Sequence, residues 1–240
     1  MTALDTAFNY HCFGAHRALA RAAADLLPSF TISTKVGYFP DGHDVDPKRL
    51  RQAVERTTEA LGAVPDTVLL HNAECSPDGF ADACALLAEL KDEGLCRAWG
   101  ISSWDPRPLL EAERGAPRPD TVMIRAGLAV PSGVLDAGEE LAARSGAQDV
   151  WGMAPFGGST TDPVWAKVDT SLFLATGQEA TPLQAAIGAA FAVPEVSRLA
   201  VGTSRLDHLA DAVHASTLAA NTETVQQYRT LLRQRATVHQ

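Results

Sequence analysis

The sequence predicts an α/β protein, built as a (β/α)8 TIM barrel that is incomplete at its N-terminus. Strand-like and helix-like segments alternate along the whole chain, and the strand-like segments are short runs of mostly apolar residues. Such alternation is typical of a parallel sheet whose helices cover its faces. In addition, polar side chains follow several strands directly, where barrels of this class place their active sites.

The first half of the chain gives clear boundaries between its elements. Asp46 and Pro47 provide an N-cap and a proline at the first helical position, and Gly62 stops the helix that they begin. Pro28 ends an earlier amphipathic helix, because proline cannot continue it. We predict strands over Thr2–Ala7, Phe30–Val36, Thr67–His71 and Ala98–Ser102, and helices over Ala15–Leu27, 46–61 and Pro77–Glu93.

The second half continues the alternation. We predict strands over Thr121–Arg125, Val150–Ala154 and Leu199–Gly202, and helices over Pro106–Glu113, Ser132–Arg144, Pro182–Phe191, Leu206–Ala219 and from Thr222 onward. The predicted strands number seven, whereas a closed barrel of this class needs about eight. Because the chain opens directly in a strand, we expect the missing first unit to precede Met1. No linker or internal repeat interrupts the chain, so we predict a single domain over residues 1–240.

Charge and composition narrow the classes of function. The net charge of −9 disfavours nucleic-acid binding, which requires a basic surface. The chain has no apolar run of about 18 residues and no signal-peptide pattern, so we expect no membrane segment and a cytoplasmic protein. The four cysteines lack the spacing of a metal site, and we predict no bound metal.

Four polar residues lie just past the ends of three predicted strands. Asp5 and Tyr10 belong to Leu-Asp-Thr-Ala-Phe-Asn-Tyr, Lys35 ends Ile-Ser-Thr-Lys, and His71 ends Val-Leu-Leu-His. Such strand ends converge on one mouth of a barrel. The ammonium of Lys35 would favour the phenolate form of a nearby tyrosine, and Asp5 would hold the lysine charged. With His71 as a second donor, the set predicts proton exchange with a substrate oxygen.

Each of these residues also has a purely structural interpretation. Asp5 could cap a turn, Tyr10 could be an aromatic residue of the barrel rim, and His71 could be a core histidine. Lys35 is harder to explain in this way, because a lysine that points inward from an apolar strand must find a counter-ion. The order and context of the four residues together favour catalysis. The histidines His11, His16 and His43 are expected in loops or in the substrate pocket.

Five segments, spread over almost the whole chain, resemble the aldo-keto reductase family, whose members are barrels that use NADPH or NADH. They keep the order that they have in the family, and the four polar residues fall within the first three of them. The segments are Asp5-Thr-Ala-x-x-Tyr10, Thr-Lys35, Leu-Leu-His71-Asn72, Lys91-x-x-Gly94-Leu-x-Arg97-Ala-x-Gly100-Ile-Ser102, and Val201-Gly202-Thr203-Ser204.

The resemblance implies an NADPH-dependent reductase of small carbonyl compounds, or an alcohol dehydrogenase that works in reverse. It implies that Tyr10 is the general acid and base, that Lys35 stabilises its phenolate form, and that Asp5 anchors the lysine. It also implies that His71 orients the substrate. The cofactor-binding residues that it implies are Ser102, Ser103, Met153, Phe156, Gly157, Gly202, Thr203, Ser204, Arg205 and Asp211.

Two further residues are assigned to the substrate pocket from their positions. Trp104 follows Ser102 by two residues and would line the pocket, although it could instead pack over the barrel rim. Arg125 lies on an apolar predicted strand, where it could bind an anionic group or pair with a carboxylate of the rim.

The chain departs from the family pattern at four cofactor positions. Ser103 stands where the family has asparagine, Met123 replaces a glutamine, Met153 replaces a stacking aromatic residue, and Ala212 replaces an asparagine near the adenine. An alternative function is therefore a barrel without redox chemistry, acting as a lyase, an isomerase or a non-catalytic binding protein. Without a first strand, the sheet would have open edges, so we also expect covering by the C-terminal helices or a homodimer.

Overall fold

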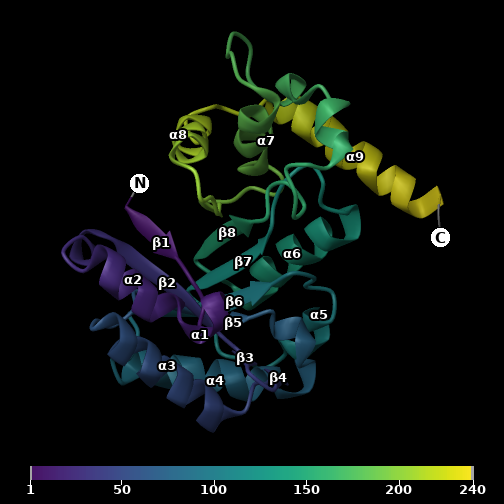
Figure 1. The fold of residues 1–240 in the computed structure, drawn as a ribbon. Helices are drawn as coiled ribbons and strands as arrows, with labels where there is room; N and C mark the ends of the chain where they lie inside the picture. Colours follow the sequence, from purple (N-terminus) through teal and green to yellow (C-terminus); the bar gives the residue numbers. More distant parts are fainter. Residues whose placement is uncertain (1, 239–240) are drawn as a thin grey trace. The chain divides into compact units, whose positions relative to one another are not determined.

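The computed structural model describes residues 2–238 and confirms the predicted alternation of strands and helices (Figure 1). The seven predicted strands are present in one sheet of the described chain, and a separate hairpin, which the sequence did not predict, follows the second of them. Hydrogen-bonded neighbours in the sheet follow the order β1 (Ala3–Asp5), β2 (Thr31–Val36), β5 (Thr67–His71), β6 (Ala98–Ser103), β7 (Thr121–Arg125), β8 (Asp149–Met153) and β9 (Arg198–Ala200). The hairpin consists of β3 (Tyr38–Phe39) and β4 (Gly42–His43).

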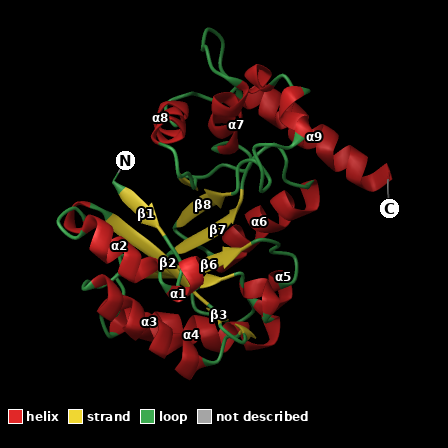
Figure 2. Ribbon diagram, viewed as in Figure 1, coloured by secondary structure: helices red, strands yellow, loops and turns green. Residues whose placement is uncertain are grey.

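Helices occupy the intervals between the strands (Figure 2). The predicted helix at Asp46 is confirmed, because the Asp46 side chain accepts the Arg49 N–H at 3.0 Å and Gly62 closes the helix at a φ of +69°. The first predicted helix is too long: it ends at Ala23, and Pro28 lies in a separate 3-10 helix. The α-helices are α1 (Tyr10–Phe13), α2 (Ala15–Ala23), α3 (Pro47–Leu61), α4 (Phe80–Asp92), α5 (Leu109–Ala112), α6 (Ser132–Ser145), α7 (Pro182–Ala190), α8 (Leu206–Ala215) and α9 (Thr222–Val238).

The described chain divides into two compact units. The first runs to Met123 and includes Glu140–Gln148, and the second contains Ile124–Glu139 and the chain from Asp149 onward. This division by packing does not test the prediction of a single domain, which stays a prediction. Among the helices of residues 2–238, none is both long enough and apolar enough to cross a membrane.

In the first unit, α3 packs against β2, and α4 packs against β5 and β6. Every residue of β5 is buried, as expected for a parallel strand that is covered on both faces. Strands β1, β2 and β5 pair in parallel, with Asp5 opposite Ser33 and Lys35 opposite Leu69. Because parallel strands bring their C-terminal ends to the same edge of a sheet, Asp5, Lys35 and His71 share one edge.

The second unit has a hydrophobic core of its own. Leu128, Trp165 and Phe173 are among the buried residues that form it, with side chains of α6, α7 and α9 packed around them. Helix α7 begins with a capping box, in which Thr181 and Gln184 each accept a main-chain N–H of the other. Such reciprocal caps satisfy donors that the first turn of a helix leaves unpaired.

Candidate active site

Lys35, at the C-terminal end of β2, places a buried positive charge in the first unit. Its side chain is 2% exposed, and its ammonium donates hydrogen bonds to Asp5 Oδ2 and to the carbonyl oxygen of Thr6, the latter at 3.0 Å. Asp5 Oδ1 accepts a further hydrogen bond from Ser33 Oγ at 2.8 Å. A buried charge persists only where it is paired and hydrogen-bonded, and both conditions hold here. The expected ion pair between Asp5 and Lys35 is therefore present.

Tyr10 is the first residue of α1, a single turn after β1 whose backbone does not have right-handed helical dihedral angles at His11 and Cys12. The Lys35 ammonium lies 5.3 Å from the centroid of the Tyr10 ring, and Tyr10 is 43% exposed. The next residues, His11, Cys12 and Phe13, have φ values of 52°, 50° and 65°. This left-handed conformation costs a non-glycine residue roughly 1–2 kcal/mol. The strained turn presents the phenol to solvent while its ring stays close to the lysine.

His71 ends β5 next to Tyr10. The centroids of the two rings are 5.9 Å apart and the ring planes meet at 77°. Burial, and after it the nearby charges of Lys35 and His43, together lower the pKa of His71 to about 3. The imidazole is therefore neutral near pH 7 and carries a single N–H. Its Nδ1 atom is buried and finds no hydrogen-bond partner within the part of the chain that the structure describes.

His16 corrects one expectation from the sequence, because it lies in the core rather than in a loop or pocket. This residue of α2 is 4% exposed, and its Nε2 is 2.8 Å from Thr34 Oγ1. Burial lowers the pKa of His16 to about 4. The hydroxyl of Thr34, on β2, provides a buried hydrogen-bond partner for this ring nitrogen.

The two buried histidines predict a loss of stability in mild acid. Below about pH 6.5 the unfolded chain protonates both His16 and His71, whereas the folded chain keeps them neutral until about pH 4 and about pH 3. Between these limits the unfolded state binds about two more protons, so the free energy of unfolding should fall as the pH falls, by roughly 2.7 kcal/mol per pH unit. Urea unfolding at pH 6.0, 5.5 and 5.0 measures this slope. In a His16→Gln variant the slope should be about half, and an unchanged slope would contradict the assignment.

Strand β6 ends in two serines, Ser102 and Ser103, which the sequence predicted to bind the cofactor. They lie next to His71. Strand register places Ser102 opposite His71, and both Ser102 and Ser103 are fully buried at 0% exposure. The Ser103 hydroxyl has no hydrogen-bond partner among residues 2–238. An unpaired hydroxyl in a buried position is costly, so this atom is suited to a polar ligand group.

Glu74 is a site residue that sequence reasoning missed. Its Oε1 accepts the main-chain N–H groups of Trp104 and Asp105, at 2.7 and 3.1 Å. This carboxylate therefore fixes the start of the loop after β6, where Trp104 is 39% exposed. The available signal was the position of Glu74, three residues after the strand end at His71.

The residues predicted to bind the cofactor phosphate form an exposed loop of the second unit, between β9 and α8. The loop contains Gly202, Thr203, Ser204 and Arg205. Arg205 pairs with Asp207, with Nε 3.0 Å from Oδ1, and its side chain is 63% exposed. An ion pair between such exposed groups contributes little free energy, so the guanidinium is available to a stronger anion.

The other predicted cofactor residues of the second unit lie on α8 and after β8. Asp211 accepts a hydrogen bond from Gln184 at 2.9 Å. Met153 is the last residue of β8, and Phe156 follows it, packed edge-on against Trp165 with 5.6 Å between ring centroids. Gly157 comes next, with a φ of +67° in the left-handed region that glycine adopts without strain.

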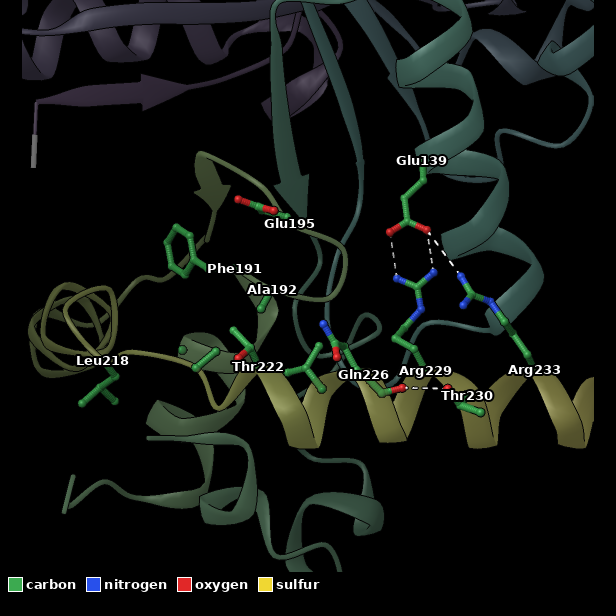
Figure 3. A pocket seen from close by; sticks show the side chains of 13 residues that line it. Glu139, Phe191, Ala192, Glu195, Leu218, Thr222, Gln226, Arg229, Thr230 and Arg233 are labelled. Atoms are coloured by element: carbon green, nitrogen blue, oxygen red, sulfur yellow. Dashed lines mark hydrogen bonds and ion pairs between the residues drawn. The ribbon is translucent and has the colours of Figure 1, made fainter. Parts of the chain in front are cut away.

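A cavity of about 650 Å³ also lies within the second unit, and the sequence did not predict it (Figure 3). Its main polar feature is a group of ion pairs that join α9 to α6. Arg229 Nη2 is 2.6 Å from Glu139 Oε2 and 2.7 Å from Asp136 Oδ1, and Arg233 also reaches Asp136 at 2.7 Å. Because these guanidinium groups already have carboxylate partners, the contacts indicate a structural role for this region.

The fold is similar to that of several solved aldo-keto reductases. The holo form of aldo-keto reductase AKR11C1 from Bacillus halodurans superimposes with a TM-score of 0.72 and 21% identity, over 97% of this chain and 82% of that one. An aldo-keto reductase from Klebsiella pneumoniae, in complex with NADP and acetate, superimposes with a TM-score of 0.70 and 18% identity, over 97% of this chain and 80% of that one. Aldose reductase from Giardia lamblia superimposes with a TM-score of 0.70 and 16% identity, over 97% of this chain and 83% of that one. Because the sequence identities are this low, the similarity to these structures establishes the fold of the chain and nothing more.

Sequence comparison assigns the family. None of the curated proteins matches the chain significantly. The family model described as "Aldo/keto reductase family" matches residues 1–233, which is nearly the whole chain. The resemblance that the five sequence segments predicted is thereby confirmed, and with it the barrel class of the fold. The chain belongs to the aldo/keto reductase family.

Proposed function

We propose that this protein is an NADPH-dependent oxidoreductase that reduces a small carbonyl compound to an alcohol, or catalyses the reverse reaction. The observation that carries the proposal is the buried ion pair of Lys35 and Asp5 next to Tyr10, with His71 in contact with the same phenol ring. Burying a charge is costly. This cost is understandable where the charge acts on an exposed phenol that exchanges a proton.

The geometry supports a separate task for each residue. Tyr10 is exposed and would give its proton to the substrate oxygen during reduction, while the Lys35 ammonium stabilises the negative charge left on the phenol. His71 is neutral and would orient the carbonyl through one N–H. We place this proton on Nε2, because a proton on the buried, unpartnered Nδ1 would leave a donor without an acceptor.

Each unit, taken by itself, contains polar groups that suit a part of a nicotinamide dinucleotide. The unpartnered hydroxyl of Ser103, with Ser102, would hold the carboxamide, as the family resemblance implies. The glycine turn at Gly157 and the loop ending in Arg205 would hold phosphate groups, for which a guanidinium is well suited. When bound, the cofactor supplies or accepts the hydride. The Klebsiella pneumoniae structure, which contains NADP, supports the choice of cofactor.

Preference for NADPH over NADH tests the cofactor assignment. If Arg205 contacts the 2′-phosphate, the wild-type protein should bind NADPH more tightly, and Arg205→Ala should abolish the difference. A charge-assisted hydrogen bond contributes about 1.5–3 kcal/mol, or on the order of 10- to 100-fold in Kd. Asp207→Asn should strengthen NADPH binding, because it removes the carboxylate that now pairs with Arg205. Fluorescence titration with both nucleotides gives the Kd values.

The control for this titration is Arg235→Ala, which removes an exposed arginine of α9 outside the loop and should leave both affinities unchanged. Equal Kd values for NADPH and NADH in the wild-type protein would remove the 2′-phosphate contact from the proposal. Failure to bind either nucleotide would favour the alternative function, a barrel of this family without redox chemistry.

A further inference from the structure

A second histidine, His43, binds the main chain of the proposed catalytic histidine. In the β3–β4 hairpin, His43 Nε2 lies 2.8 Å from the carbonyl oxygen of His71, and its Nδ1 lies 2.9 Å from Ser76 Oγ. A carbonyl oxygen only accepts, so His43 donates through Nε2, and Nδ1 is left to the hydroxyl of Ser76. The ring therefore ties the hairpin to the end of β5 and to the segment that follows it.

Gly37 packs closely against this contact, so a side chain at this position would be crowded. Gly37, between β2 and the hairpin, has a φ of +139°. A Cβ atom there would lie 3.1 Å from His43 Nε2 and 3.1 Å from the carbonyl oxygen of His71. Glycine at position 37 thus provides both the backbone conformation and the space for the hydrogen bond between the two histidines.

Tyr38 contacts both imidazoles from the same hairpin. Its ring centroid is 4.8 Å from that of His43 and 5.0 Å from that of His71, and both contacts are edge-on. The Tyr38 hydroxyl accepts a hydrogen bond from the side-chain amide of Asn72 at 3.2 Å. Asn72 has a left-handed φ of 48°, which asparagine adopts more readily than most residues, and this contact ties the residue directly after His71 to the hairpin.

We propose that His43 and Tyr38 are positioning residues that hold the imidazole of His71 in one orientation and one tautomer. The inference rests on the proposed function of His71 as the residue that orients the substrate carbonyl. His71 has a ring contact with Tyr10 as well as with Tyr38, while His43 fixes its main chain. Rotation of the imidazole by half a turn would move its donor nitrogen away from the substrate side, and the packed rings oppose that rotation.

A matched pair of substitutions isolates the hydrogen bond from the volume of the side chain. His43→Gln keeps a donor at about the reach of Nε2, whereas His43→Leu keeps bulk and removes the donor. A small misplacement of a catalytic group can lower turnover by up to about 100-fold. We expect His43→Leu to lower kcat by on the order of 10-fold with little change in KM, and His43→Gln to restore most of the loss. Tyr38→Ala should lower kcat more than Tyr38→Phe, which keeps the ring.

A spectroscopic measurement separates positioning from a merely structural role. In protein labelled with ¹⁵N-histidine, NMR reports which imidazole nitrogen of His71 carries the proton. The wild-type protein should show a single neutral tautomer, His43→Leu a mixture of two, and His43→Gln the wild-type state. His208→Ala, which removes an exposed histidine of α8, serves as the control for assignment and should leave the His71 signals in place.

Two results would overturn the proposal. One is an unchanged His71 tautomer in His43→Leu, and the other is a His43→Gln variant that behaves like His43→Leu in both measurements. The NMR experiment does not depend on turnover. Absence of NADPH oxidation by the wild-type protein would therefore count against the proposed function alone, while the tautomer of His71 would still test the roles of His43 and Tyr38.

Discussion

Tyr10→Phe should reduce turnover by on the order of 10²–10⁴-fold, the usual contribution of a positioned general acid or base. The substitution keeps the ring that lies beside the Lys35 ammonium and beside His71, and it removes only the hydroxyl. Because the residue is 43% exposed, the folded protein should lose little stability. Nucleotide affinity should also be retained. Steady-state rates with a carbonyl compound that the wild-type protein reduces, together with nucleotide titrations, measure these effects.

Tyr228→Phe is a matched control for this experiment, because it removes a phenol hydroxyl from the second unit. Tyr228 donates a hydrogen bond to the carbonyl oxygen of Leu128 in the hydrophobic core. Its loss should lower the free energy of unfolding by about 1 kcal/mol and leave turnover near that of the wild type. If Tyr10→Phe retains nearly full activity, Tyr10 is not the proton donor and the proposed mechanism is wrong.

Asp5→Asn should be among the most destabilising substitutions in the first unit. It would leave the Lys35 ammonium, which is 2% exposed, without a counter-ion, and removing one partner of a buried ion pair costs about 3–5 kcal/mol. Urea unfolding of the variant and the wild type at pH 7 measures this loss.

The companion substitution Lys35→Met separates the charge from the volume of the side chain. Asp5 is 25% exposed and keeps its hydrogen bond from Ser33, so the loss of stability should be smaller than in Asp5→Asn. The double variant Asp5→Asn/Lys35→Met should be more stable than Asp5→Asn alone, because no buried charge remains. All three variants should have low turnover. If Asp5→Asn and the double variant had equal free energies of unfolding, the unpaired Lys35 charge would not destabilise the protein as expected.

The sequence predicted the regular part of this fold well, because each signal was local. Asp46, Pro47 and Gly62 determine the ends of α3 through hydrogen bonds and backbone conformations within a few residues. The short apolar strand Thr67–His71 was predicted with its exact bounds for the same reason. The contact between Asp5 and Lys35 could also be predicted, since parallel strands bring their ends to one edge.

What the sequence did not reveal depends on contacts between distant segments. The β3–β4 hairpin is short and lacks an alternating pattern, and it forms over the end of β5 through the bonds of His43. The hydrogen bond of the buried His16 is made with Thr34, which lies on β2. The role of Glu74 depends on its hydrogen bonds with the main chain of the loop after β6. The roles of Trp104 and Arg125 in a substrate pocket, and the homodimer, stay predictions.

The left-handed turn after Tyr10 has a consequence for how the protein folds. Three successive residues with positive φ oppose the local preferences of an L-amino-acid chain, so the turn cannot form as an independent nucleus. It is held instead by contacts such as the edge-on packing of Phe13 against Phe8, 5.6 Å between centroids. A partly folded chain, even with its helices in place, would therefore lack a correctly presented phenol. In this protein, recovery of activity after refolding would report completion of the tertiary structure of the first unit, later than recovery of helix content.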